Sequence, residues 1–137
     1  MSKKETPLTI AYWKKVKGTL IEEYPIVKQE KNCGRRWLDG LIIRNELFTK
    51  LAPYSENNIN LEGLDIISIQ TQFGRIGMYH LGQAFFSMKL LELKKPKSIK
   101  SVAICTKTDF YMEKIIKDIP NLYIQVINPE TLDFKII

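Results

Sequence analysis

The central strand and the main helix of the fold are predicted by residues 65–87, DIISIQTQFGRIGMYHLGQAFFS. Residues 65–71 alternate, so that Gln70 and Gln72 fall on one face of the strand while their neighbours fall on the other. From residue 75 to about residue 93 the apolar residues recur at helical spacing instead. Two amides on the same face, at the end of an otherwise apolar strand, need a structural or a functional reason.

Further elements are predicted on both sides of this stretch. Before it, a helix is predicted over residues 8–24, which Thr6 or Thr9 caps and Pro25 ends, followed by a short strand over 26–30 and a strand over 35–42. A polar connection over 46–63 then holds Pro53 and the tract SENNIN, with one helical turn near 47–51. After it come a strand over 101–106, a helix over 109–118 before Pro120, and a strand over 122–128. The order α, β, β, β, α, β, α, β predicts a mixed sheet with helices on both faces, which is an α/β or α+β sandwich. Gly77 and Gly82 each cost about 1 kcal/mol relative to alanine in a helix, so we expect them to allow close packing against the sheet.

Composition favours one compact domain over residues 1–137. The chain is 45% hydrophobic and 26% charged, which is enough to bury a core. The net charge of +6 favours an anionic partner, with nucleic acid as the first candidate. Cys33 and Cys105 are the two cysteines of the chain and form no CxxC motif, so neither a zinc site nor a disulfide framework is expected. Because no apolar run approaches the roughly 18 residues of a membrane span, we expect a cytoplasmic protein without membrane contact.

Asp39, within the stretch RRWLDGLI, is the strongest single pointer to a site. An aspartate in an otherwise hydrophobic strand is costly unless hydrogen bonds, a cation or a metal compensate its charge. Carboxylates from Asp39 and Glu23, with the side-chain carbonyl of Gln70, are hard oxygen ligands that suit Mg²⁺ or Mn²⁺. Such an ion would polarise a phosphodiester and lower the pKa of a bound water.

These elements resemble the PD-(D/E)XK nuclease superfamily. The resemblance covers roughly residues 10–106 and rests on the helix with Glu23, the strand with Asp39, and the strand IQTQ followed by a helix. It implies an αβββαβ restriction-endonuclease-like core, here with a C-terminal αβ extension, and a Mg²⁺- or Mn²⁺-dependent deoxyribonuclease activity. It also implies that Asp39 and Gln70 bind the metal and that Glu23 is an accessory carboxylate on the first helix.

Gln72 departs from the superfamily, because it stands where the resemblance expects a lysine. A neutral amide cannot supply the positive charge that stabilises a developing phosphorane. Arg75 is the nearest substitute, and Lys28 or Lys50 could serve only if the fold brings them in. Arginine stabilises charge but is a poor general base, so hydrolysis is either supported by such a cation or impaired. The predicted catalytic set is therefore Asp39, Gln70, Gln72 and Arg75.

Nucleic-acid contacts are predicted next to this set. Arg75, Tyr79 and Gln83 recur at i, i+4 and i+8 and form a polar stripe that could face a phosphate backbone. Arg35 and Arg36, at the start of the aspartate-bearing strand, are the other predicted nucleic-acid-binding residues.

Plainer interpretations remain open at each position. Asp39 could be a structural aspartate that pairs with Arg35 or Arg36, and the two glutamines could be exposed residues of a half-buried sheet. His80 has no partner at metal-ligand spacing and is expected on the helix surface.

Three functions follow from these alternatives. The first is a metal-dependent nuclease-like protein that hydrolyses DNA, with activity that Gln72 could impair. The second is an inactive nuclease-fold protein that binds nucleic acid or forms a complex. The third is a homo-oligomeric module whose aromatic helix, MYHLGQAFF, packs against a copy of itself, so that a homodimer is conceivable.

Overall fold

The computed structural model describes residues 3–51 and 59–135. Within these residues the elements are, in chain order, α1 (Thr6–Val16), β1 (Gly18–Val27), β2 (Arg36–Ile43), β3 (Phe48–Leu51), β4 (Asp65–Thr71), α2 (Met78–Glu92), β5 (Ser98–Cys105), α3 (Phe110–Ile116), β6 (Leu122–Ile127) and β7 (Phe134–Lys135). None of these helices is both long and apolar enough to cross a membrane.

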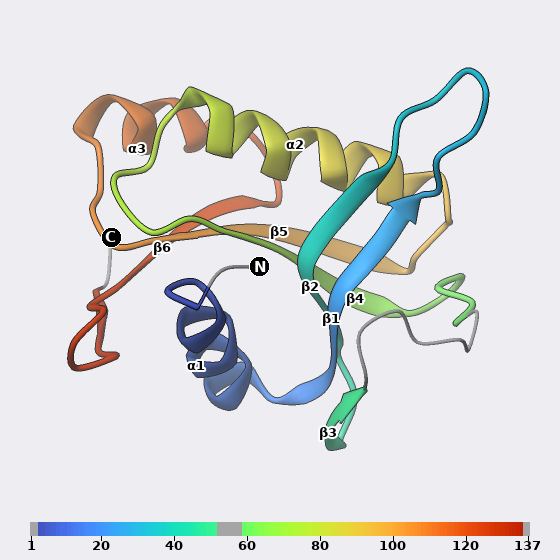
Figure 1. Cartoon of the computed structure of the whole chain (residues 1–137), viewed down its shortest axis with the longest axis horizontal. Coiled ribbons are helices and arrows are strands. Elements are labelled where there is room, and N and C mark those ends of the chain that lie inside the picture. Colours follow the sequence, from blue (N-terminus) through green and yellow to red (C-terminus); the bar gives the residue numbers. More distant parts are fainter. Residues whose placement is uncertain (1–2, 52–58, 136–137) are drawn as a thin grey trace.

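All seven strands of the described residues belong to one mixed sheet, in the order β3-β1-β2-β4-β5-β6-β7. The middle strands β4, β5 and β6 run parallel, whereas β2 is antiparallel to both β1 and β4. The crossovers through α2 and α3 place both helices on the same side of the sheet, and α1 lies on the other side (Figure 1). The predicted mixed sheet with helices on both faces is therefore confirmed.

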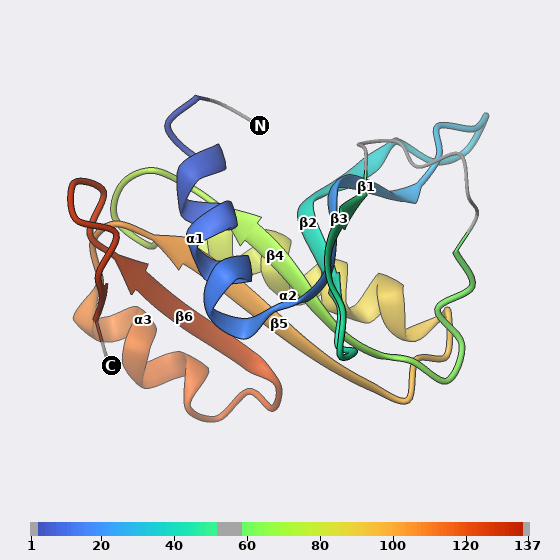
Figure 2. The ribbon, with the colours of Figure 1, turned by 90° about the horizontal axis from the view of Figure 1, so that it is seen from below.

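The hydrophobic core has two layers because the sheet is covered on both sides. The helix α1 lies across one face of the sheet (Figure 2). On this side, Leu8 and Trp13 pack against the inward residues of β1, β2 and β4. On the side of α2, Met88 and Leu91 pack against a second set from the same strands. The strand β4 is buried from Ile66 to Thr71, as expected of a central strand covered on both faces.

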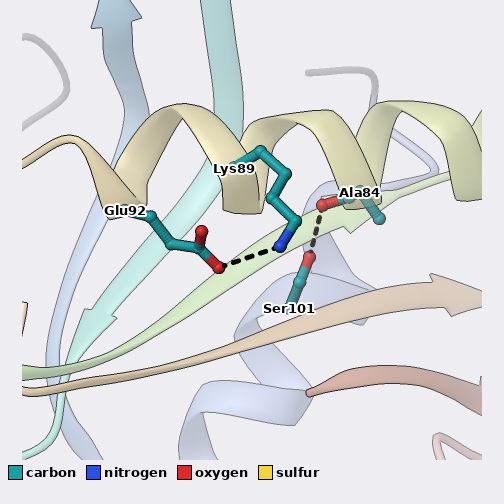
Figure 3. A network of polar contacts seen from close by, with 4 residues as sticks. All are labelled: Ala84, Lys89, Glu92 and Ser101. Carbon is teal, nitrogen blue, oxygen red and sulfur yellow. Dashed lines mark hydrogen bonds and ion pairs between the residues drawn. The ribbon is translucent and has the colours of Figure 1, made fainter. Parts of the chain in front are cut away.

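A buried hydroxyl anchors α2 on the sheet. Ser101 on β5 donates to the carbonyl of Ala84 in α2 over 2.7 Å, as Figure 3 shows. Such a bond contributes about 1 kcal/mol when both groups are buried. The neighbouring ion pair of Lys89 and Glu92, at 3.4 Å, is exposed and contributes little to stability.

The first helix ends eight residues earlier than predicted. Lys17 and Gly18 both have positive φ, of 64° and 91°, and a Cβ at Gly18 would lie 2.5 Å from the carbonyl oxygen of Ile43. This glycine ends α1, and the apolar residues that follow pair with β2 as strand β1. Pro25 therefore lies within a strand, and Glu23 comes from β1 instead of the first helix.

Other predicted boundaries are also corrected. Of the strand expected over 26–30, residues 26–27 are the end of β1 and the rest lies beyond it. The helical turn expected near 47–51 is the strand β3, and α2 begins at Met78, so that Arg75 precedes the helix. The short strand β7 was not predicted. Pro53 and residues 55–58 of the SENNIN tract lie outside the described residues. The strand over 65–71 is confirmed, and Asp109 caps α3 by accepting the N–H groups of Tyr111 and Met112 at 2.9 and 3.0 Å.

The glycines of α2 do not have the role predicted for them. A Cβ at Gly77 or Gly82 would meet nothing within 4 Å, so close packing against the sheet does not require them. Gly40 on β2 is different, because a Cβ there would lie 3.2 Å from both Thr9 of α1 and Leu20 of β1. The close approach of α1 to the sheet therefore depends on Gly40.

We expect Gly40→Val to lower the free energy of unfolding by about 1–3 kcal/mol, because the branched side chain must displace α1. Gly82→Ala, the control in open space, should raise the free energy of unfolding by up to about 1 kcal/mol by favouring the helix. Urea unfolding followed by circular dichroism measures both. An unchanged urea midpoint for Gly40→Val would show that α1 does not pack closely against this glycine.

Candidate functional site

The predicted site lies where β2 and β4 separate. The ladder between these strands runs from Ile43 opposite Ile66 to Gly40 opposite Ile69 and goes no further. One residue beyond, Oδ2 of Asp39 accepts the backbone N–H of Thr71 over 2.7 Å. The carboxylate of Asp39 thus takes the place of a ladder carbonyl where the two strands separate, and it accepts a hydrogen bond from a backbone amide. Among the described residues it forms no ion pair with Arg35 or Arg36.

The environment of Asp39 disfavours its charge. Burial raises the pKa of this carboxyl from 3.8 to about 6; the Thr71 N–H opposes the shift, and the carboxylates of Glu5 and Glu23 add to it. A raised pKa in a partly buried carboxyl that lies near other carboxylates is a feature of functional sites as well as of strained structural ones.

Glu23 lies across the β1–β2 pair from Asp39. Glu22 pairs with Gly40 and Tyr24 pairs with Leu38, which sets Glu23 opposite Asp39. Glu23 has a φ of 51°, an uncommon backbone conformation for a residue with a side chain. The structure therefore brings this accessory carboxylate near Asp39, but from a strand and with local backbone strain.

Gln70 is buried and bound within the protein. Its Nε2 donates to the carbonyl of Trp37 at 3.0 Å and to the hydroxyl of Ser87 at 3.2 Å. Because a carbonyl oxygen only accepts, the nitrogen must face Trp37, and Oε1 is the atom left to meet a ligand. The interpretation of Gln70 as an exposed sheet residue is wrong, since its exposed fraction is 7%.

Gln72 lies just beyond β4 and is exposed. Its backbone N–H continues the pairing with β5 by donating to the carbonyl of Ile104 over 2.9 Å. The plainer interpretation, an exposed residue of the sheet, therefore describes Gln72 but not Gln70.

His80, in the first turn of α2, is buried and contacts the end of β4. It is 2% exposed, contrary to the expectation of a surface residue, and its Nε2 lies 2.7 Å from the carbonyl oxygen of Gln70. Burial lowers the pKa of His80, so the neutral ring donates from Nε2 to that carbonyl. The burial of His80 could have been predicted from the sequence. The spacing of a buried helix face is shared by His80, Ala84, Ser87 and Leu91.

The three cations that were predicted to act in place of a lysine at position 72 have other positions or partners. Nη1 of Arg75 donates to the carbonyl of Thr108 over 2.6 Å, on the β5 side of β4, whereas Asp39 lies on the β2 side. Lys50 is 3.3 Å from Glu22, and Lys28 is exposed at the end of β1. The structure does not bring Arg75 together with Asp39, and Arg75 does not share the α2 stripe with Tyr79 and Gln83.

A metal ion at this site stays a prediction. Among residues 3–51 and 59–135, no three side chains of His, Cys, Asp or Glu converge in a way that could hold an ion. The predicted ligand set for Mg²⁺ or Mn²⁺, Glu23, Asp39 and Gln70, includes an amide and is not a cluster of that kind.

A groove of about 810 Å³ lies between the start of β2 and the outer face of α2. Four of the five predicted nucleic-acid-binding residues, Arg35, Arg36, Tyr79 and Gln83, line it together. Its other lining residues are Trp37, Gln70, Met78, Gly82, Phe86, Ser87 and Leu90, so within residues 3–51 and 59–135 no acidic side chain lines the groove. Gln70 connects this groove to the strand that meets Asp39.

Comparison with known proteins gives one informative match. The chain is similar in fold to a repair endonuclease. The crystal structure of this repair endonuclease, from Pyrococcus abyssi, aligns with a TM-score of 0.56 and 12% sequence identity, over 94% of this chain and 48% of that one. No family model and no curated protein matches the chain. At this identity the likeness shows the fold alone, and the seven-stranded mixed sheet with three helices is consistent with a restriction-endonuclease-like α+β fold, which confirms the predicted fold class.

Proposed function

We propose that this chain is a nuclease-fold protein that binds nucleic acid and is impaired in hydrolysing it. The observation that carries the proposal is the groove beside α2, which combines Arg35 and Arg36 with exposed aromatic rings and, among the residues that the structure describes, has no acidic side chain in its lining. The net charge of +6 adds a long-range attraction for a polyanion. The similarity in fold to a repair endonuclease supports nucleic acid as the class of partner.

Impaired hydrolysis follows from the two glutamines. A nuclease of the PD-(D/E)XK type places a positive charge beside its metal-binding carboxylates, and Gln72 is neutral. Gln70 offers one amide oxygen where a charged ligand would bind a hard cation more strongly. Neither Arg75 nor Lys50 takes over, because each is bound elsewhere.

Metal-dependent hydrolysis of DNA, at a low rate, is the second candidate. The observation in its favour is the raised pKa of Asp39 next to the carboxylates of Glu5 and Glu23, an arrangement that a bound cation would stabilise. The two candidates share the binding step and differ in whether the phosphodiester bond is cleaved.

Binding is tested by fluorescence anisotropy with fluorescein-labelled DNA at several salt concentrations. We expect Arg35→Ala with Arg36→Ala to weaken binding by about tenfold or more and to reduce the salt slope by about 2, because two phosphate contacts are lost. Lys114→Ala with Lys117→Ala, at two exposed lysines around α3, is the matched control and should change affinity much less.

Cleavage is measured on the same samples by gel electrophoresis, with Mg²⁺, with Mn²⁺ and with EDTA. We expect the DNA to remain intact on the time scale of binding. Rapid metal-dependent cleavage that Asp39→Asn abolishes would replace the first candidate by the second. Absence of binding to any nucleic acid would contradict both candidates.

A further inference from the structure

We propose that the groove beside α2 takes single-stranded nucleic acid, with bases stacked on Tyr79 and Phe86 and phosphates held by Arg35 and Arg36. This inference rests on the proposed function and specifies its ligand. It is carried by the exposure of the rings, their spacing and the charge of the rim.

The two rings are open to solvent. Tyr79 is 78% exposed and Phe86 is 66% exposed, and Met78 beside them is 79% exposed. The opposite face of α2 is also apolar and is buried on the sheet, through Leu81, Ala84, Met88 and Leu91. A helix that is apolar on both faces is usually covered on both, and an exposed apolar patch of this kind marks a binding surface.

The spacing of the rings suits a strand lying along the helix. Tyr79 and Phe86 are seven residues apart, which is two helical turns and about 10 Å along the axis of α2. A single strand that passes along the helix can therefore stack one base on each ring. Phe85 meets Phe86 edge-on at 5.3 Å between ring centroids and so supports it on one side.

The arginines are held at the rim of the groove but are not neutralised there. The guanidinium of Arg35 lies 4.9 Å from the centre of the Trp37 ring, and Nη1 of Arg36 donates to the carbonyl of Arg35 over 3.2 Å. In the part of the chain that the structure describes, neither arginine has an ion pair with a carboxylate. Both guanidinium groups thus remain able to bind phosphate, which they can contact through two parallel hydrogen bonds.

These features favour a single strand over two other occupants. In a duplex the bases are stacked on one another, so exposed aromatic rings cannot reach their faces, whereas single-stranded bases stack on such rings regardless of sequence. A second copy of this chain would bring another net charge of +6 and another pair of arginines toward the same rim. Oε1 of Gln70 and the amide of Gln83 in the groove can in addition hydrogen-bond to base edges.

The test compares a labelled 20-nucleotide single strand with the duplex of the same sequence, by fluorescence anisotropy in EDTA. We expect the wild type to bind the single strand at least about tenfold more tightly than the duplex. Tyr79→Ala with Phe86→Ala should weaken single-strand binding by about 10²-fold, because each stacked base is worth about 1–3 kcal/mol, and should leave duplex binding nearly unchanged. Phe110→Ala with Tyr111→Ala is the matched control, since these rings on α3 are 63% and 70% exposed but lie outside the groove.

Three outcomes would overturn the inference. Equal affinity for single strand and duplex, unchanged by Tyr79→Ala with Phe86→Ala, would leave the proposed function standing and remove the single-strand assignment. Absence of binding to either probe would remove both. A dimer in light scattering that Phe86→Glu dissociates, without loss of nucleic-acid binding, would assign the groove to a second copy. Urea unfolding of each variant checks that the fold is intact.

Discussion

Magnesium-dependent DNA cleavage is expected to rise by at least about 10²-fold over the wild type when Gln70→Glu and Gln72→Lys are combined, since one missing charge-stabilising group of this kind costs about that factor. Gln72 is exposed, so a lysine fits there without repacking. Glu at position 70 adds a second carboxylate beside the strand junction where Asp39 lies. The change restores, on this fold, the charge pattern that the resemblance to PD-(D/E)XK nucleases implies.

The same double variant should lose stability when no metal is present. A glutamate at position 70 turns a carboxylate toward the carbonyl of Trp37, which now accepts the Gln70 amide at 3.0 Å. The lost hydrogen bond and the new repulsion should cost about 1–3 kcal/mol, measured by urea unfolding in EDTA. Addition of Mg²⁺ should recover part of this loss if the restored carboxylates bind the ion.

Asp39→Asn in the double variant is the control for cleavage. It keeps a side-chain oxygen that accepts the Thr71 N–H, yet removes the charge. Cleavage should therefore disappear while folding is retained. A double variant that cleaves no better than the wild type would show that the separation of β2 and β4 does not position these groups for chemistry.

Asp39→Asn in the wild-type background is expected to raise the free energy of unfolding at pH 7. The pKa of Asp39 is raised in the folded state from 3.8 to about 6, so the folded protein takes up this proton more readily than the unfolded chain does. The stability that this gives is fully present below about pH 4 and is lost as the pH rises through 6. The loss amounts to at most about 3 kcal/mol, at 1.36 kcal/mol per pKa unit.

The measurement is urea unfolding at pH 4 and at pH 7. The wild type should lose stability between these values through Asp39, whereas Asp39→Asn should remove that part of the change and be about 1–3 kcal/mol more stable at pH 7. Asp118→Asn, at an exposed carboxyl after α3, is the control and should leave the difference between the two pH values as it is. If Asp39→Asn instead destabilises the protein at pH 7, the charged carboxylate is held by a favourable partner, and a bound cation becomes the first candidate.

Several features of the fold could be predicted from the sequence because they depend on local patterns. The alternation of residues 65–71 gives the strand β4 within its observed bounds, and the order of elements gives a mixed sheet with helices on both faces. The helix α3 could be predicted from residues 109–118 because its N-cap, Asp109, directly precedes it in the chain. That Arg35, Arg36, Tyr79 and Gln83 bind nucleic acid stays a prediction, and the structure adds that all four line one groove.

What the sequence by itself determined is thus the strand that carries Gln70, the neutral amide of Gln72 just after it, and the basic charge of the chain. The tertiary structure alone decided that the apolar residues after Gly18 form a strand, since periods of 2 and 3.6 cannot be told apart over so few residues. It also decided that His80 is buried against β4 and that Arg75 binds Thr108, away from Asp39. In the same way, only the tertiary structure places the arginines at the start of β2 and the rings of α2 in one groove. The physical reason is that these contacts join residues far apart in the chain. They depend on which strands pair and in which register, and local sequence patterns do not specify this.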